Sequence, residues 1–208
     1  MSKIDLGNLN TLQYDVLKEL GNIGAGNATT ALSKLINAKI DMRVPKVNLL
    51  GFSELASAMG KEEDIMVGIL LLLEGDIDGM MMFLLEVDSA RALVNSLMGK
   101  PNDNVGNNDI NFDEMEYSAL REIGNIITGS YLSALSDLTR LTIVSSVPSL
   151  QIDMAEAILS IPAIEFSKIG DKVLLIQTQF DDDSKISGYF VLVPELDSYD
   201  KILSSLGL

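Results

Sequence analysis

The second half of the chain repeats the residue order of its first half. Residues 14–23 align with residues 117–126 at an offset of 103, and six of these ten positions carry the same residue. Beyond Pro45 and its equivalent Pro148 the offset becomes 109, because the second copy holds six additional residues. An ordered match through about two thirds of each half indicates an internal duplication, so the fold must accommodate two equivalent units.

Each copy predicts the same succession of elements: a long helix, a strand that ends at the proline, a short helix, a hairpin and a closing helix. In the first copy these are 10–37, 39–44, 53–59, 66–73 with 79–85, and a helix from 88. In the second copy they are 111–139, 141–147, 153–159, 173–180 with 188–193, and a helix from 197. Asp88 and Asp197 are the predicted N-caps of the closing helices. The apolar stripes expected on the long helices are Leu12, Val16, Leu20 and Ile23, and Met115, Ala119, Ile123 and Ile126.

Neither half is large enough for a comfortable core of its own, since each offers three strands and a few helices. We therefore predict one domain over residues 1–208, built of two repeats (about 1–100 and 109–208) joined by a linker at 101–108. The expected fold class is α/β (α+β). Two homologous halves related by pseudo-two-fold symmetry share a mainly antiparallel sheet of about six strands, with the long helices packed on it.

Composition excludes several kinds of chemistry. The chain has no Cys and no His, so a thiol nucleophile, a thiolate metal site and a histidine base are all absent. Its net charge of −15 disfavours nucleic acid and anionic membrane surfaces as partners and favours a basic protein surface. The N-terminus lacks a signal-peptide pattern, and the most apolar run, 65–73, is too short to span a membrane. We expect a cytoplasmic protein without membrane insertion.

The polar residues that stand out lie on the first long helix. Asp15, Glu19 and Asn22 are spaced i, i+4 and i+7, which places them within an arc of roughly 60°. The equivalent residues of the second copy are Ser118, Glu122 and Asn125. A solvated helix face is the simplest interpretation of one such set. Asn and the adjacent Gly are poor helix formers, however, and their presence in both copies favours a functional role.

Glycines cluster in the first long helix at Gly21, Gly24 and Gly26. Their spacing fits neither a dinucleotide-binding fingerprint nor a Walker motif, and no Lys-Ser or Lys-Thr follows them. Two uses stay open: close packing against another helix, or access for the backbone of a partner.

The chemistry open to a Glu–Asn pair is limited. An Asn amide is neither a base nor a nucleophile at neutral pH, but it can hold a water molecule in line with a phosphorus atom. Positioning of this kind, together with charge stabilisation, accounts for much of phosphoryl-transfer catalysis. Because the pair has no cation or metal ligand of its own, it suits a protein substrate that brings Mg²⁺, Lys and a labile acyl phosphate.

The pattern Asp/Ser-x3-Glu-x2-Asn-x22-Pro occurs twice, ending at Pro45 and at Pro148. It resembles the CheC / CheX / FliY family of CheY-phosphate phosphatases, and two complete copies in 208 residues are similar to its CheC type. The resemblance implies that both prolines are structural. It also implies dephosphorylation of the phosphorylated response regulator CheY, Mg²⁺ in that regulator, no cofactor or metal of the chain's own, and binding of CheD, a receptor-modifying deamidase.

The resemblance also implies roles for single residues. Asn22 and Asn125 would orient the attacking water, and Glu19 and Glu122 would form a salt bridge with a Lys of the regulator. Asp15 and Ser118 would support these pairs. Two alternatives stay open. The chain could act mainly as a CheD-binding adaptor, or as a flagellar-switch phosphatase of the FliY type, which would predict a further C-terminal domain.

Overall fold

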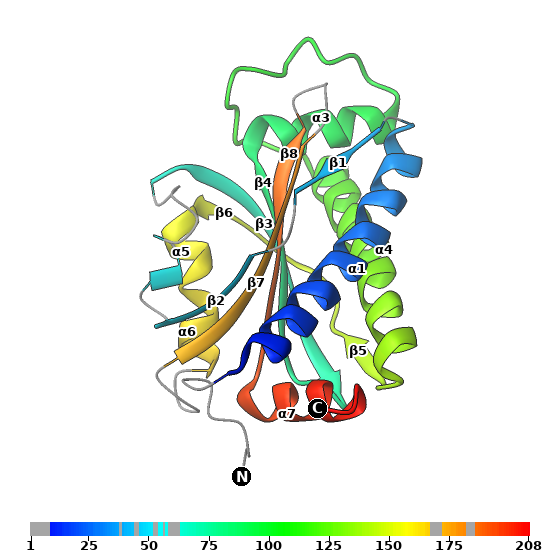
Figure 1. Cartoon of the computed structure of the whole chain (residues 1–208). Helices are drawn as coiled ribbons and strands as arrows, with labels where there is room; N and C mark the ends of the chain where they lie inside the picture. Colours follow the sequence, from blue (N-terminus) through cyan, green and yellow to red (C-terminus); the bar gives the residue numbers. More distant parts are fainter. Residues whose placement is uncertain are drawn as a thin grey trace.

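The computed structural model describes residues 9–37, 39–43, 46–51, 54–55, 57, 63–166, 172–181 and 186–208 (Figure 1). The described helices are α1 (Thr11–Ile36), α3 (Val87–Met98), α4 (Glu114–Thr139), α5 (Ala155–Leu159), α6 (Ile161–Phe166) and α7 (Leu196–Ser205). The described strands are β1 (Asp41–Met42), β2 (Lys46–Gly51), β3 (Ile65–Gly75), β4 (Gly79–Glu86), β5 (Ile143–Ser145), β6 (Ser149–Met154), β7 (Lys172–Asp181) and β8 (Ser187–Pro194). Helices α1 and α4 cover one face of the sheet, and α5 and α6 lie on the other.

All strands join one antiparallel sheet with the order β1-β7-β8-β4-β3-β5, in which β2 also pairs with β7 and β6 with β3. The predicted fold class is confirmed, but the sheet has eight strands among the described residues, whereas the sequence indicated about six. The difference arises because the chain forms a second strand after each proline. Pro148 is buried between β5 and β6, where its missing N–H interrupts the ladder along β3. Pro45 lies outside the described residues.

The two halves exchange strands. Strands β1 and β2 of the first half pair with β7 of the second, and β5 and β6 of the second half pair with β3 of the first. The central pair, β4 and β8, joins the halves. In this pair Met82 lies opposite Val191, which is also its equivalent at the 109-residue offset. The pseudo-two-fold axis therefore passes through this residue pair, and neither half contains a complete sheet.

The closing helices α3 and α7 strengthen the contact between the two halves through two equivalent serines. Ser89 on α3 accepts a hydrogen bond from the N–H of Ser187 at 2.9 Å, and Ser198 on α7 accepts one from the N–H of Asp78 at 2.8 Å. Each serine thus contacts the hairpin of the opposite half. Helices α3 and α7 accordingly lie at opposite ends of the molecule (Figure 1).

The predicted N-caps of these closing helices are wrong. Glu86 and Glu195 occupy the N-cap positions of α3 and α7, and neither side chain makes a capping hydrogen bond. Asp88 and Asp197 lie in the first turns instead. Both helices follow their strands with at most one residue between, so each begins two residues earlier than an Asp cap would allow.

Capping residues determine where the two long helices begin and end. Asn10 and Gln13 form a reciprocal capping box at the start of α1, and Asp113 and Glu116 form the same motif at the start of α4. At the other end, Asn37 and Arg140 take left-handed conformations that stop the helices. The predicted ranges of 10–37 and 111–139 are therefore confirmed to within a few residues.

The buried side of α1 differs from the predicted stripe. Leu12 is 55% exposed, and its equivalent Met115 is 67% exposed. The buried residues of α1 are Leu17, Leu20, Gly21, Gly24, Ala25, Ala28, Thr29 and Leu32. Many of them are small, because this side packs closely against α4, and a pattern of large apolar residues could not reveal it.

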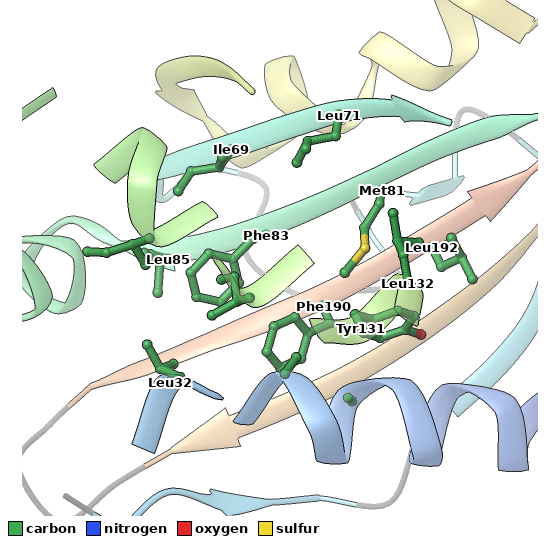
Figure 2. Packing of buried hydrophobic residues seen from close by; sticks show 14 of the residues in the cluster. Leu32, Ile69, Leu71, Met81, Phe83, Leu85, Tyr131, Leu132, Phe190 and Leu192 are labelled. Carbon is green, nitrogen blue, oxygen red and sulfur yellow. The ribbon is translucent and has the colours of Figure 1, made fainter. Parts of the chain in front are cut away.

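The main core lies between the sheet and the long helices. Phe83 of β4 and Phe190 of β8 stack in its centre, with ring centroids 5.2 Å apart, and Tyr131 of α4 packs against Phe190 at 6.1 Å (Figure 2). Burial in this apolar layer raises the pKa of the Tyr131 hydroxyl. A second apolar layer on the opposite face of the sheet is closed by α5, through residues such as Ile158.

Two glycines allow the long helices to approach their neighbours. A Cβ added at Gly24 would lie 2.6 Å from the Tyr131 ring, and one added at Gly124 would lie 2.5 Å from Cγ2 of Ile69. In contrast, a Cβ added at Gly26 or Gly129 would meet nothing within 4 Å. Close packing is therefore the use of Gly24 and Gly124, but it does not account for the other two.

The segment between the linker and α4 is held against the first half by Arg91, which is buried on α3. Its guanidinium donates to the carbonyl oxygens of Asp109 and Asn111, each at 2.8 Å, and lies 4.2 Å above the ring of Phe112. It also lies 3.5 Å from the carboxylate of Glu116, which completes the capping box of α4. This cluster fixes where the second long helix begins.

Gly124→Ala is expected to lower the free energy of unfolding by about 1–3 kcal/mol, because the added methyl group overpacks the core against Ile69. Gly129→Ala on the same helix is the matched control, and should raise this free energy by up to about 1 kcal/mol through helix propensity. Urea denaturation of both variants tests the contrast. Equal stabilities would contradict it.

Arg91→Ala should lower the free energy of unfolding by about 2–4 kcal/mol, because Glu116 would keep only the partly exposed Lys100 as an ionic partner. Arg121 is exposed on α4, so Arg121→Ala serves as the control and should change stability by less than about 0.5 kcal/mol. Thermal or urea unfolding measures both variants. An Arg91→Ala variant as stable as the control would refute the role of this cluster.

Candidate functional site

Both Glu–Asn pairs lie on the outer side of the long helices, away from the sheet. The first pair is carried by α1 and the second by α4, and these two helices cross on the same face of the molecule (Figure 1). The small buried residues of α1 face α4 and the sheet, so its polar side is turned outward. Asn22 of the first pair is half-buried. The other residues predicted for the site are exposed: Glu19, Glu122 and Asn125 of the pairs, and the neighbouring Asp15 and Ser118.

The amide groups of the two pairs are only weakly engaged. Nδ2 of Asn22 lies 3.5 Å from Oε2 of Glu19, at the limit of a hydrogen bond. On α4, which the structure describes in full, Asn125 makes no hydrogen bond with Glu122. Both amides can therefore turn to an external group at little energetic cost.

The carboxylates of the pairs form no ion pair within the ranges that the structure describes, although other exposed acids such as Asp41 do. The described contact of Glu19 is the long hydrogen bond from Asn22. Each carboxylate can therefore bind a cation from another molecule without first breaking a described ion pair.

A groove of about 870 Å³ lies between the outer sides of α1 and α4. Asn125 lines it from α4, and Thr30 and Lys34 line it from α1. Ser133 and Asp137, the equivalents of Thr30 and Lys34, line it from α4. The sequence of either helix alone does not single out these residues, because only the crossing of the helices brings them beside Asn125.

The structure shows two further features of the described residues. In that part of the chain, no three acidic side chains gather in a way that would hold a metal ion. None of the helices it describes combines the length and the apolarity needed to cross a membrane.

Comparison with known proteins places this geometry in a family. The sequence model of the CheC-like family matches residues 12–49 and 115–152, so each match contains one Glu–Asn pair and one proline. The CheY-P phosphatase CheC of Bacillus subtilis is 38% identical over 198 residues, which cover 94% of each chain. The flagellar motor switch phosphatase FliY of the same organism is 26% identical over 148 residues, which cover 71% of this chain and 38% of that protein.

Structural comparison agrees with the sequence. The crystal structure of Thermotoga maritima FliY superposes with a TM-score of 0.74, covering 96% of this chain and 98% of that one, at 23% identity. At that level of identity the likeness shows a shared fold. Since the identity to the Bacillus subtilis protein extends over nearly the whole sequence, the chain belongs to the CheC-like family.

Proposed function

We propose that this chain hydrolyses the acyl phosphate of a phosphorylated CheY-type response regulator. The observation that carries the proposal is the surface Glu–Asn pair, weakly engaged within the chain, which occurs on both α1 and α4. The 38% identity to a protein named CheY-P phosphatase CheC supports the choice of substrate. The absence of His and Cys from the sequence supports a mechanism in which the chain forms no covalent intermediate.

In the proposed mechanism the amides of Asn22 and Asn125 each orient one water molecule. The amide oxygen accepts a hydrogen bond from the water and so fixes its oxygen in line with the phosphorus atom. A bond forms between the water oxygen and phosphorus as the bond from phosphorus to the aspartyl oxygen breaks, which releases inorganic phosphate and the free carboxylate. The regulator supplies the Mg²⁺ and the Lys that neutralise the charge on the phosphoryl oxygens.

The proposed role of Glu19 and Glu122 is to dock the regulator. Each carboxylate lies about one helical turn before its Asn and would form a salt bridge with a Lys of the regulator. Asp15 and Ser118 lie one further turn away and would support this contact. An exposed ion pair contributes little by itself, but exclusion of water in a complex strengthens it.

Three further parts of the proposal follow from the family resemblance. The reaction would take place in the cytoplasm, the Mg²⁺ would belong to the regulator, and CheD would bind as a second partner. A role as a FliY-type switch phosphatase is the second candidate, and the fold shared with Thermotoga maritima FliY supports it. Both candidates use the same Glu–Asn pairs, whereas an adaptor that only bound CheD would not need them.

The variant Asn22→Ala with Asn125→Ala should reduce dephosphorylation of the regulator to its spontaneous rate, because no amide remains to orient water. Its free energy of unfolding should change by less than about 0.5 kcal/mol, since neither Asn makes a strong internal contact. Phosphate release measures the first effect and urea denaturation the second. Asn107→Ala, an exposed site in the linker, is the control. Undiminished hydrolysis by the double variant would refute the mechanism.

The variant Glu19→Lys with Glu122→Lys should raise the KM for the phosphorylated regulator by about tenfold or more, because each change places a cation opposite the proposed Lys. The control variant, Glu156→Lys with Glu165→Lys, changes the net charge by the same amount. Its two positions lie on α5 and α6, on the other face of the sheet (Figure 1). Steady-state kinetics of the two variants separates docking from net charge. A similar KM for both would argue against the docking role.

A further inference from the structure

Three positions on each long helix lie in line with one another. Leu12, Glu19 and Gly26 are seven residues apart, and seven residues make just under two turns, so they drift by only about 20° per step. The equivalent residues of α4 are Met115, Glu122 and Gly129. Each line is about 21 Å long and contains the proposed docking carboxylate at its middle.

One end of each line is an exposed large apolar side chain. Leu12 is 55% exposed and Met115 is 67% exposed. A single exposed apolar residue needs no explanation on a protein surface. Here the same position is apolar and exposed in both copies, on the side of the helix that carries a carboxylate without a described ion pair. Packing among the described residues does not account for this arrangement.

The other end of each line is a glycine that packing does not require. A Cβ at Gly26 or Gly129 would meet nothing within 4 Å, whereas one at Gly24 or Gly124 would clash with the core. Both unexplained glycines lie inside long helices, where glycine is the least favourable residue apart from proline. Each lies four residues after a proposed catalytic Asn, so both are neighbours of that Asn on the helix surface.

We infer that each line is a docking strip for the folded surface of the phosphorylated regulator. The apolar side chain at one end and the carboxylate in the middle contact the regulator, and the glycine at the other end leaves the helix main chain uncovered. The inference rests on the proposed function and adds Leu12, Met115, Gly26 and Gly129 to the binding surface. The glycine lets the regulator approach the helix main chain one turn beyond the Asn, and so brings the acyl phosphate within reach of its amide. A side chain there would hold the regulator away.

The negative charge of the strips favours a regulator with a basic docking surface as the molecule that binds to them. The strips carry the carboxylates of Glu19 and Glu122, which form no ion pair with a described residue, and the chain as a whole has a net charge of −15. The groove of about 870 Å³ continues this surface, since both Asn125 and Gly129 line it. The strip on α4 is therefore continuous with the space beside the proposed catalytic amide.

The test measures binding by the full chain of a CheY-type regulator treated with beryllofluoride, a mimic of the acyl phosphate. Gly26→Leu with Gly129→Leu should raise the Kd by about tenfold or more. The melting temperature should stay the same or rise, because leucine is a better helix former than glycine and its Cβ would meet no atom within 4 Å. Ser96→Leu with Ser204→Leu, at exposed positions of α3 and α7, is the matched control and should leave the Kd unchanged.

A second variant tests the other end of the strip. Leu12→Ser with Met115→Ser should raise the Kd several-fold without lowering the melting temperature, since both side chains are largely exposed. A Kd within twofold of the unmodified chain for both variants would overturn the docking strip while leaving the proposed hydrolysis intact. Failure of the unmodified chain to bind or dephosphorylate the regulator would overturn both proposals.

Discussion

The exchange of strands around the central β4–β8 pair is the constraint on which the rest of the structure depends. Because Met82 lies opposite its own equivalent Val191, the described strands, long helices and closing helices of one half have counterparts across the same axis. Each half supplies strands that pair with the hairpin of the other half, so the sheet is complete only when both halves are present. The symmetry also determines the arrangement of the long helices, which must cross on one face of this sheet (Figure 1).

Small residues at the crossing of α1 and α4 let this symmetry bring the polar sides of both helices onto one surface. Gly24 receives the ring of Tyr131, and the close approach turns the polar sides of both helices outward. Side chains that would be unremarkable on isolated helices thereby come to border a common groove, as Asn125 and Lys34 do. The buried side of each helix thus stabilises the fold, and its exposed side carries the proposed site.

Much of this arrangement could be predicted from the sequence, because duplication doubles every local signal. The long helices, the hairpins and the two Glu–Asn pairs are visible as repeated patterns, and the structure places the helices and hairpins as expected. The strand after Pro148 was not predicted, since its partner β3 lies far away in the sequence. The buried side of α1 was misplaced because its packing uses glycine and alanine, which carry little hydrophobic signal. Residues such as Lys34 become neighbours of the site only through the helix crossing.

Joining both copies in one polypeptide has a consequence for how the sites can evolve. Two identical subunits arranged about an axis would have to accept every substitution twice, whereas a fused chain encodes its equivalent positions separately. The molecule already shows such divergence, since Asp15 corresponds to Ser118, and Lys34 in the groove corresponds to the oppositely charged Asp137. One scaffold can therefore hold two centres that are tuned independently, and either can change while the other preserves the original activity.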